Sequence, residues 1–273
     1  MIAFFLLTPD RGESRVVLEV IFMNFVVNPN LPDNPVRLAV VDGRIGEEAE
    51  AMLISLGVKL LKLKPHESLY TAVCSHPDMV LYHIGGEKIV YAPGTDSELL
   101  ENLLSFGFSL LEGESLLSST YPFDIAYNVA RVGSRYFHNL KYTDPVIRRQ
   151  LEMLGVEPVH VEQGYAKCSV LPLDENSMIT ADKGIAKAAE KKGLEVLLVD
   201  CDKSIRLPGL DYGFIGGTGG LLAKYTCVFT GSIARLSCFD AMSAFLSKKG
   251  FIFKSLTQGD MIDIGSILPL MMS

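Results

Sequence analysis

Three residues in two separate segments could together perform nucleophilic chemistry. Cys168 supplies a thiol, and His76 and Asp78 form a His-x-Asp pair earlier in the chain. A thiolate attacks an electrophilic carbon, a histidine moves protons, and a carboxylate orients the histidine. Lys167 precedes Cys168, and a neighbouring positive charge lowers the pKa of a thiol. We therefore interpret Cys168 as a candidate nucleophile, His76 as a candidate acid or base, and Asp78 as its orienting carboxylate.

Each of these residues also has a structural interpretation. A free cysteine is more often a small buried hydrophobic residue than a nucleophile. Neighbours on a strand point to opposite faces, so Lys167 and Cys168 need not share one space. Asp78 could cap a turn, with His76 hydrogen-bonded locally. The sequence leaves both roles open. Three further cysteines are interpreted as packing residues: Cys201, Cys227 and Cys238.

Further polar residues lie in comparable turns elsewhere in the chain. Asp124 and Asn128 belong to the segment Pro-Phe-Asp-Ile-Ala-Tyr-Asn-Val, where strand alternation would place both on one face. Asp211 and Asp263 add two carboxylates. With Lys167, these residues are candidate ligands for a small polar or cationic molecule. No tight spacing of His, Asp and Glu ligands appears, so the sequence predicts neither a metal site nor another cofactor.

A glycine-rich stretch, Gly-Gly-Thr-Gly-Gly at 216–220, suggests phosphate binding at first sight. It lacks the Lys-Ser/Thr of a P-loop, and no helix clearly follows it, so the dinucleotide pattern does not fit either. The alternative interpretation is a bend in which two backbone segments approach closely.

Composition narrows the class of protein. The chain has 273 residues, 48% of them hydrophobic, and a formal net charge of -7. Lys and Arg are spread without a basic stripe, which argues against a nucleic-acid surface. No apolar run approaches the roughly 20 residues that span a bilayer. Five cysteines without a Cys-x-x-Cys pair are typical of reduced thiols in a cytoplasmic protein. The sequence does not indicate an oligomeric state.

The elements that must position these residues repeat five times. Five amphipathic helices, each ending at a glycine and followed by an apolar strand, are expected at 46–56, 96–106, 144–154, 182–192 and 239–249. Asp96, Asp144 and Asp182 are good N-cap residues. Glycine after the last helical residue supplies the left-handed conformation that ends a helix. With a strand before each helix and a polar turn into a further strand, the pattern is a strand-helix-strand-strand repeat.

The repeat predicts an α/β fold in which five such units close into a five-bladed propeller with pseudo-fivefold symmetry. An open doubly wound sheet is the alternative, but it does not predict an Asp- or Cys-bearing turn at the same place in every unit. One domain is expected over 23–273, and residues 1–22 are interpreted as an accessory extension or a mis-assigned start before Met23. The approximate units are 36–93, 88–143, 134–182, 177–231 and 227–273.

This organisation resembles the penteins, also called the guanidine-modifying enzyme fold, over nearly all of 36–273. The segment Ala-Lys-Cys-Ser-Val-Leu from Ala166 is similar to the family's Glu-Gly-Gly-Asp-Val-Leu strand. The nearest resemblance is to an uncharacterised bacterial branch. The family includes deiminases, dimethylarginine hydrolases, amidinotransferases and a non-catalytic ribosomal factor. The resemblance implies a central site with a carboxylate from that strand, a His-x-Asp in the fourth unit and a nucleophilic cysteine near the C-terminus.

The sequence departs from the family's pattern at each of these places. Ala-Lys-Cys-Ser replaces Glu-Gly-Gly-Asp, Gly-Leu-Asp ending at Asp211 replaces His-x-Asp, and Gly265 or Ser266 stands at the family's cysteine. The usual deiminase mechanism is therefore not supported. Two functions stay open. One is a Cys-dependent hydrolase or transferase acting at a carbon–nitrogen bond through a rearranged site. The other is a non-catalytic pentein that binds a ligand or assists assembly.

Overall fold

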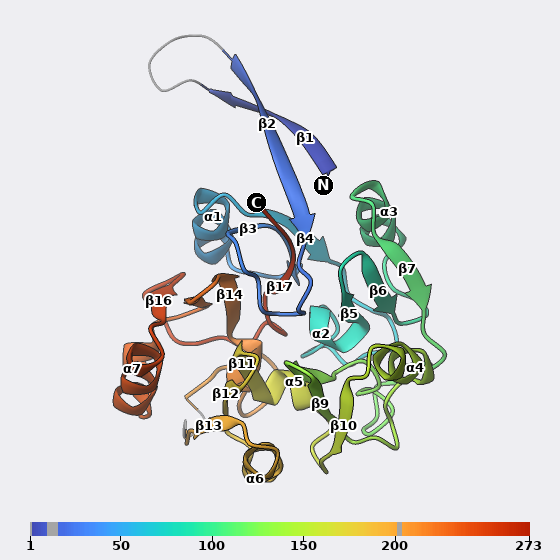
Figure 1. The fold of residues 1–273 in the computed structure, drawn as a ribbon, viewed down its shortest axis with the longest axis vertical. Coiled ribbons are helices and arrows are strands. Elements are labelled where there is room, and N and C mark those ends of the chain that lie inside the picture. The colour runs from blue at the N-terminus through green and yellow to red at the C-terminus, as the bar shows by residue number, and fades with distance from the viewer. Residues whose placement is uncertain (1, 10–15, 201–203) are drawn as a thin grey trace.

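Five helices form where the glycine-terminated patterns predicted them, and they lie on the outside of a ring (Figure 1). The computed structural model describes residues 2–9, 16–200 and 204–273. The helices are α1 (Glu47–Ser55), α3 (Ser97–Ser105), α4 (Pro145–Met153), α6 (Lys183–Lys191) and α7 (Phe239–Lys248). The glycines that end them all have positive φ: Gly57, Gly107, Gly155, Gly193 and Gly250. The predicted helix ends are confirmed.

Two of the three predicted N-caps are confirmed. Asp144 accepts hydrogen bonds from the backbone N–H groups of Val146 and Ile147, and Asp182 accepts one from that of Ile185. Asp96 occupies the predicted N-cap position of α3, but its side chain makes no capping hydrogen bond. Its Oδ1 instead lies 3.7 Å from the ammonium group of Lys64.

Each of the second to fifth repeats forms its own three-stranded sheet, with an antiparallel hairpin, a helical crossover and a third strand parallel to its neighbour in the hairpin. The second to fifth repeats contain β5 (Leu81–Gly85), β6 (Lys88–Tyr91), β7 (Ser109–Glu112); β8 (Ala130–Val132), β9 (Arg135–His138), β10 (Glu157–His160); β11 (Val170–Asp174), β12 (Ser177–Thr180), β13 (Glu195–Leu198); and β14 (Gly219–Ala223), β15 (Thr226–Phe229), β16 (Ile252–Ser255). The predicted five-bladed α/β propeller is therefore the observed fold.

The ring closes by pairing the last strand with the first repeat. β17 (Leu268–Met272) pairs antiparallel with β3 (Val36–Asp42), which pairs parallel with β4 (Lys59–Leu63). β2 (Val16–Phe25) joins the other edge of β17, and β1 (Ile2–Pro9) pairs with β2. The hairpin β1–β2 extends this sheet away from the ring (Figure 1). Nothing in the structure tests the interpretation of residues 1–22 as an extension.

Short helical turns lie towards the centre of the ring, where the sequence analysis expected polar turns that lead into strands (Figure 1). They are α2 (Pro77–Val80), α5 (Ala166–Ser169) and η1 (Ile215–Gly217). Two expectations are wrong as a result. Lys167 and Cys168 are consecutive residues of α5 and not of a strand. Asp124 and Asn128 lie in turns before β8 because the Asn128 N–H bonds back to the Ile125 carbonyl, 2.8 Å away, and not to a neighbouring strand.

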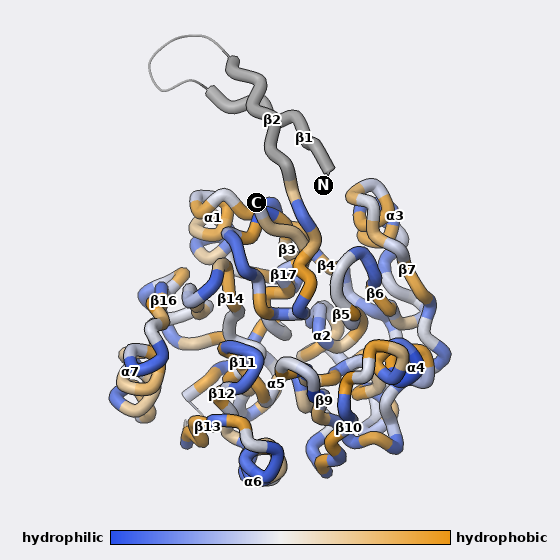
Figure 2. Tube along the Cα trace, in the orientation of Figure 1, coloured by the Kyte–Doolittle hydropathy of each residue, from blue (hydrophilic) through white to orange (hydrophobic). Residues whose placement is uncertain are grey.

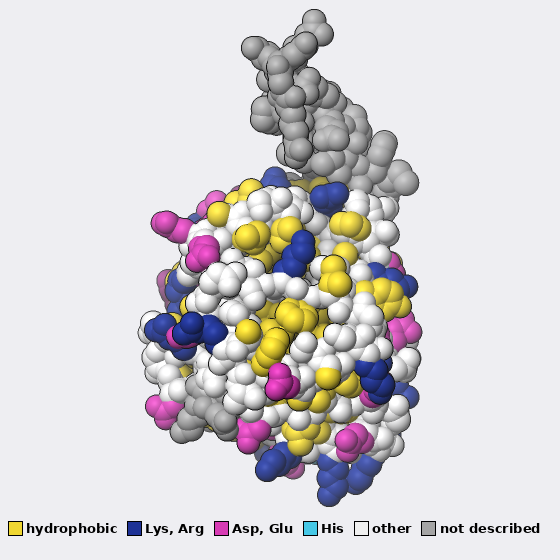
Figure 3. Space-filling model, turned by 90° about the vertical axis from the view of Figure 1, so that its left-hand side faces the viewer, with side chains coloured by type: hydrophobic (Ala, Val, Ile, Leu, Met, Phe, Trp, Pro, Cys, Tyr) yellow, Lys and Arg dark blue, Asp and Glu magenta, His cyan; other side chains and the backbone are white. Residues whose placement is uncertain are grey.

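The core is apolar, and α6 is the most clearly amphipathic of the five outer helices. The outer rim at α6 is strongly polar (Figure 2), whereas Ile185, Ala186 and Ala189 of the same helix are buried. Cys227 and Cys238 are buried as predicted, and Cys201 lies outside the described residues. On the side shown in Figure 3, hydrophobic side chains gather near the middle of the face, and Lys, Arg, Asp and Glu side chains lie mostly towards its edges. Within the described part of the chain, every helix is too short or too polar to cross a bilayer.

Candidate functional site

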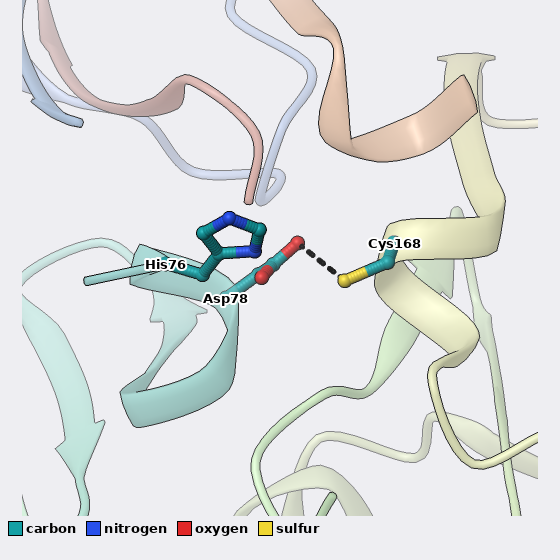
Figure 4. Close-up of side chains that lie close together, drawn as sticks. All are labelled: His76, Asp78 and Cys168. Atoms are coloured by element: carbon teal, nitrogen blue, oxygen red, sulfur yellow. Dashed lines mark hydrogen bonds between the residues drawn. The ribbon is translucent and has the colours of Figure 1, made fainter. Parts of the chain in front are cut away.

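His76, Asp78 and Cys168 meet at the centre of the ring. His76 precedes α2, Asp78 belongs to α2, and Cys168 comes from α5 of another repeat. His76 offers a nitrogen, Asp78 an oxygen and Cys168 its sulfur, and these three atoms lie within 4.8 Å of one another. All three residues are buried. Figure 4 shows the carboxylate of Asp78 between the imidazole ring and the sulfur. This donor set could also hold a metal ion. The sequence spacing does not signal this donor set, because Cys168 comes from a different repeat from His76 and Asp78.

The thiol of Cys168 is held by two hydrogen bonds. Its Sγ donates to Asp78 Oδ2 at 3.3 Å and accepts from Asn128 Nδ2 at 3.1 Å. The amide oxygen of Asn128 accepts from the backbone N–H groups of Lys167, at 2.8 Å, and Cys168, at 3.1 Å. Asn128 therefore fixes both the first turn of α5 and the position of the sulfur.

The surroundings of Cys168 favour the protonated form of its thiol. Burial raises the pKa of Cys168 well above its usual value, and the negative charges of Asp78 and Asp263 add to the effect. The expectation that Lys167 would lower this pKa is wrong. Its ammonium group turns away to Ser266, where Nζ donates to Oγ at 2.7 Å. Burial lowers the pKa of Lys167 itself, against the attraction of Asp78 and Asp263.

Ser266 connects Lys167 to Asp78. Its Oγ lies 2.9 Å from Asp78 Oδ2 and 2.9 Å from the Gly216 carbonyl oxygen, and it can donate to one of them at a time. Its φ of 75° is in the left-handed region that non-glycine residues seldom adopt. The sequence placed Ser266 near the family's cysteine but gave it no role, whereas the structure makes it the bridge of a buried polar network.

His76 lies between two carboxylates other than Asp78. Its Nε2 is 3.7 Å from Asp42 Oδ2, and its Nδ1 is 3.9 Å from Asp263 Oδ1. Asp42 is fixed by Arg44, whose Nη2 and Nε lie 2.7 and 3.0 Å from its two oxygens. The sequence analysis missed Asp42 and Arg44. Their only signal was the position of an aspartate at the end of an apolar strand.

Asp263 is oriented by the backbone. Its Oδ2 accepts from the N–H of Phe214 at 2.8 Å, and its Oδ1 from the N–H of Gly265 at 3.0 Å. Burial raises its pKa, while His76 opposes this rise. The glycine-rich stretch makes the geometry possible, because a Cβ on Gly217 would overlap the Asp263 carboxylate. The interpretation of 216–220 as a close backbone approach fits this arrangement.

Gly217→Ala is therefore expected to displace Asp263 and to lower the free energy of unfolding by about 1 to 3 kcal/mol, as overpacking does. Urea denaturation would measure the change. Gly259→Ala is the matched control, because the nearest atom to its added Cβ, Thr257 Oγ1, is at an ordinary 3.6 Å. Equal stability of the two variants would contradict the packing argument.

A pocket of about 340 Å³ opens onto this cluster. Its acidic and reactive lining consists of His76, Cys168, Asp211 and Asp263, and its aromatic lining of Tyr70, Tyr165, Tyr212 and Phe214. Asp211 is exposed at this pocket. Asp124 contributes indirectly, since it accepts the hydrogen bond of the Tyr165 hydroxyl, and burial raises its pKa. Four of the predicted site residues therefore line this pocket: His76, Cys168, Asp211 and Asp263. Asp78 and Asn128 do not line it but are hydrogen-bonded to the Cys168 sulfur, and Lys167 joins them through Ser266. Asp124 is hydrogen-bonded to Tyr165 of the pocket wall.

Residues 40–268 match the model of a protein family described as "Family of unknown function (DUF6873)". The chain belongs to this family. No curated protein matches this DUF6873 member. Solved structures do match. An amidinotransferase of the saxitoxin pathway from Microseira wollei shares 14% identity, with a TM-score of 0.52, over 84% of this chain and 91% of its own. The inosamine-phosphate amidinotransferase of Streptomyces griseus shares 14% identity at 0.52, over 85% and 91%.

Two hydrolytic enzymes show the same likeness. A DDAH from Pseudomonas aeruginosa in complex with citrulline is 12% identical, with a TM-score of 0.51, over 81% of this chain and 92% of its own. The agmatine deiminase of C. jejuni is 8% identical at 0.51, over 86% and 91%. At such identities the likeness shows the fold alone. The DUF6873 member has the pentein fold, as the resemblance in its sequence implied.

Proposed function

We propose that the protein is a Cys168-dependent hydrolase or transferase that acts at a carbon–nitrogen bond of a small cationic substrate. The observation that carries this proposal is the meeting of a thiol, an imidazole and carboxylates at one pocket. The fold supports the substrate class, because the similar structures include amidinotransferases and an agmatine deiminase.

The pocket suits a cation for two reasons. Asp211 and Asp263 place negative charge on its wall, and aromatic faces, which attract cations, surround the rest. A bound positive charge also favours the thiolate, because opposite charge nearby lowers the pKa of a thiol. Substrate binding would therefore offset the burial that keeps Cys168 protonated in the free protein.

The arrangement supports a sequence of balanced steps. Asp78, which accepts the thiol hydrogen bond, takes the proton of Cys168, and the thiolate forms a bond to the planar carbon of the substrate. The carbon–nitrogen bond breaks as protonated His76 donates its proton to the leaving nitrogen. Water or an acceptor amine then attacks the carbon, giving a proton to His76 and breaking the carbon–sulfur bond. Asp78 returns its proton to the sulfur.

In this proposal Asp42 orients His76 from the Nε2 side, at 3.7 Å, and Nδ1 exchanges the proton with the leaving nitrogen. Asp78, first predicted as the orienter, serves the thiol instead. Asn128 positions the sulfur and the backbone of α5. Lys167 helps to hold Asp78 in place through Ser266.

The proposal predicts amine release from agmatine or another small guanidino or amidino cation, with chelator present throughout. Cys168→Ala is expected to lower the rate by about 1,000-fold or more, since the nucleophile is lost. Cys74→Ser is the matched control, because Cys74 Sγ donates to the Thr71 carbonyl oxygen at 3.3 Å, a hydrogen bond that a serine hydroxyl can replace. Amine release that survives in Cys168→Ala would contradict the role of the thiol.

One observation favours the second function, a non-catalytic ligand-binding protein: the pKa of Cys168 is raised well above its usual value in the free protein. The same experiment separates the two. Saturable binding of a cation by calorimetry, without amine release and unchanged in Cys168→Ala, is the result expected of a binding protein.

A further inference from the structure

Two buried polar atoms beside the thiol have no hydrogen-bond partner among the described residues. They are Nδ1 of His76 and Oδ1 of Asp78, in side chains that are 1% and 3% exposed. Nearly all buried polar groups are hydrogen-bonded, so an unpartnered pair at one place points to a missing water or ion. Both unpartnered atoms belong to residues whose donor atoms cluster with Cys168 Sγ.

We propose that His76, Asp78 and Cys168 form a binding site for Zn²⁺, with the fourth coordination position open to the pocket. The donor atoms are a nitrogen, an oxygen and a sulfur, each within 4.8 Å of the others. Zn²⁺ accepts all three donor types in a tetrahedron, and three protein ligands with an open position are typical of its accessible sites. A thiolate and an imidazole are poor ligands for Mg²⁺ or Ca²⁺, which prefer oxygen.

The surroundings of the three ligands resemble the outer shell of a metal site. A metal-binding histidine commonly directs its other nitrogen to a carboxylate. The Nε2 of His76 lies 3.7 Å from Asp42, which Arg44 fixes from the far side. Figure 4 shows a ring nitrogen of His76 directed towards the Asp78 carboxylate, with the sulfur of Cys168 beyond it. Asn128 Nδ2 donates to that sulfur at 3.1 Å, as a partner of a thiolate ligand would.

The charges balance when the ion binds. The S–H bond of Cys168 breaks, its proton leaves to solvent, and a Zn–S bond forms. The thiolate and Asp78 together neutralise the two positive charges of the ion. The ammonium group of Lys167, the nearest fixed cation of the network, is bonded to Ser266 and reaches Asp78 only through it. Asp42 and Asp263 add negative charge around His76.

This site goes beyond the proposed function and does not depend on it. In the zinc-bound form the thiolate shares an electron pair with the ion, and His76 and Asp78 also hold the ion, so the reaction proposed above would belong to the metal-free form. Zn²⁺ is then expected to block alkylation of Cys168. The two proposals fail separately, because metal binding is measured without substrate and amine release is measured with chelator.

Co²⁺ titration of the metal-free full chain tests the site. One Co²⁺ per chain is expected to give a thiolate-to-cobalt charge-transfer absorption that Zn²⁺ abolishes by displacement. Cys168→Ser should remove the band, and His76→Gln should weaken binding by about 100-fold. Cys74→Ser and His160→Gln are the matched controls and should retain both the absorption band and the affinity for Co²⁺. The Cys74 thiol donates to the Thr71 carbonyl, and His160 is half exposed beside Glu162. A band that persists in Cys168→Ser, or its absence in the wild type, would overturn the proposal.

A measurement on the wild type alone covers the case in which a variant does not fold. Zn²⁺ should protect Cys168, identified by peptide mass spectrometry, from N-ethylmaleimide under mild denaturant that exposes it slowly. Protection should be stronger at Cys168 than at Cys227, a buried thiol outside the His76–Asp78–Cys168 group whose pKa is raised by burial alone. Equal modification of both thiols with and without Zn²⁺ would contradict the site.

Discussion

Replacement of Asp144 by alanine is expected to lower the free energy of unfolding by about 3 to 4 kcal/mol, because one buried carboxylate serves two segments. Its Oδ1 accepts from the N–H groups of Val146 and Ile147 at the start of α4, at 2.8 and 3.3 Å. Its Oδ2 accepts from those of Glu114 and Ser115, at 2.8 and 2.7 Å. Alanine would leave four backbone donors without this acceptor, in a side-chain site that is 0% exposed.

Asp182→Ala is the matched control for this prediction. Asp182 caps α6 in the equivalent position of the next repeat, but it accepts from only one backbone donor, Ile185, at 2.7 Å. A single cap of this kind contributes about 1 kcal/mol. Urea denaturation of both variants measures the difference, and Asp144→Asn should fall between them because it keeps one acceptor oxygen. Equal losses for the two alanine variants would show that Asp144 does no more than cap its helix.

The contrast between these two caps shows how far the sequence determines the fold. Residue type and spacing identify both aspartates as N-caps, since that signal is local. The second pair of donors to Asp144 comes from the segment after β7, a tertiary contact that no local pattern contains. Asp96 also stands at its predicted N-cap position, but its carboxylate makes no capping hydrogen bond and lies 3.7 Å from Lys64 of the preceding repeat, another tertiary contact that no local pattern contains.

The candidate site was likewise predictable where its signal lies in the sequence pattern, and not where it depends on tertiary contacts. His76, Asp78 and Cys168 were found because repetition predicts a ring, and a ring brings equivalent turns together. The conformation of α5 was missed, since a helix of four residues is too short to show periodicity. The direction of the Lys167 side chain was also missed. It depends on Ser266, whose hydroxyl reaches Nζ only after the last repeat has closed the ring.

Asp78→Asn is expected to change two measured rates in opposite directions. Burial has the largest effect in raising the pKa of Cys168, the negative charge of Asp78 has the next largest, and that of Asp263 follows. Removing that charge lowers the pKa, so the thiolate fraction at a fixed pH below it increases. A fall of one pKa unit would raise the alkylation rate about tenfold. Measured with chelator, the rate should also reach its midpoint at a lower pH than in the wild type.

Amine release should fall in the same variant by about 100-fold or more, because an amide cannot take the proton of Cys168. A merely structural role would lower both rates, or neither. Asp124→Asn is the matched control. Its carboxylate is also buried, but it faces the Tyr165 hydroxyl and is not among the groups that shift the pKa of Cys168. It should leave the alkylation profile unchanged. An Asp78→Asn profile that coincides with the wild type would show that burial alone keeps the thiol protonated, and Asp78 would lose its place in the reaction.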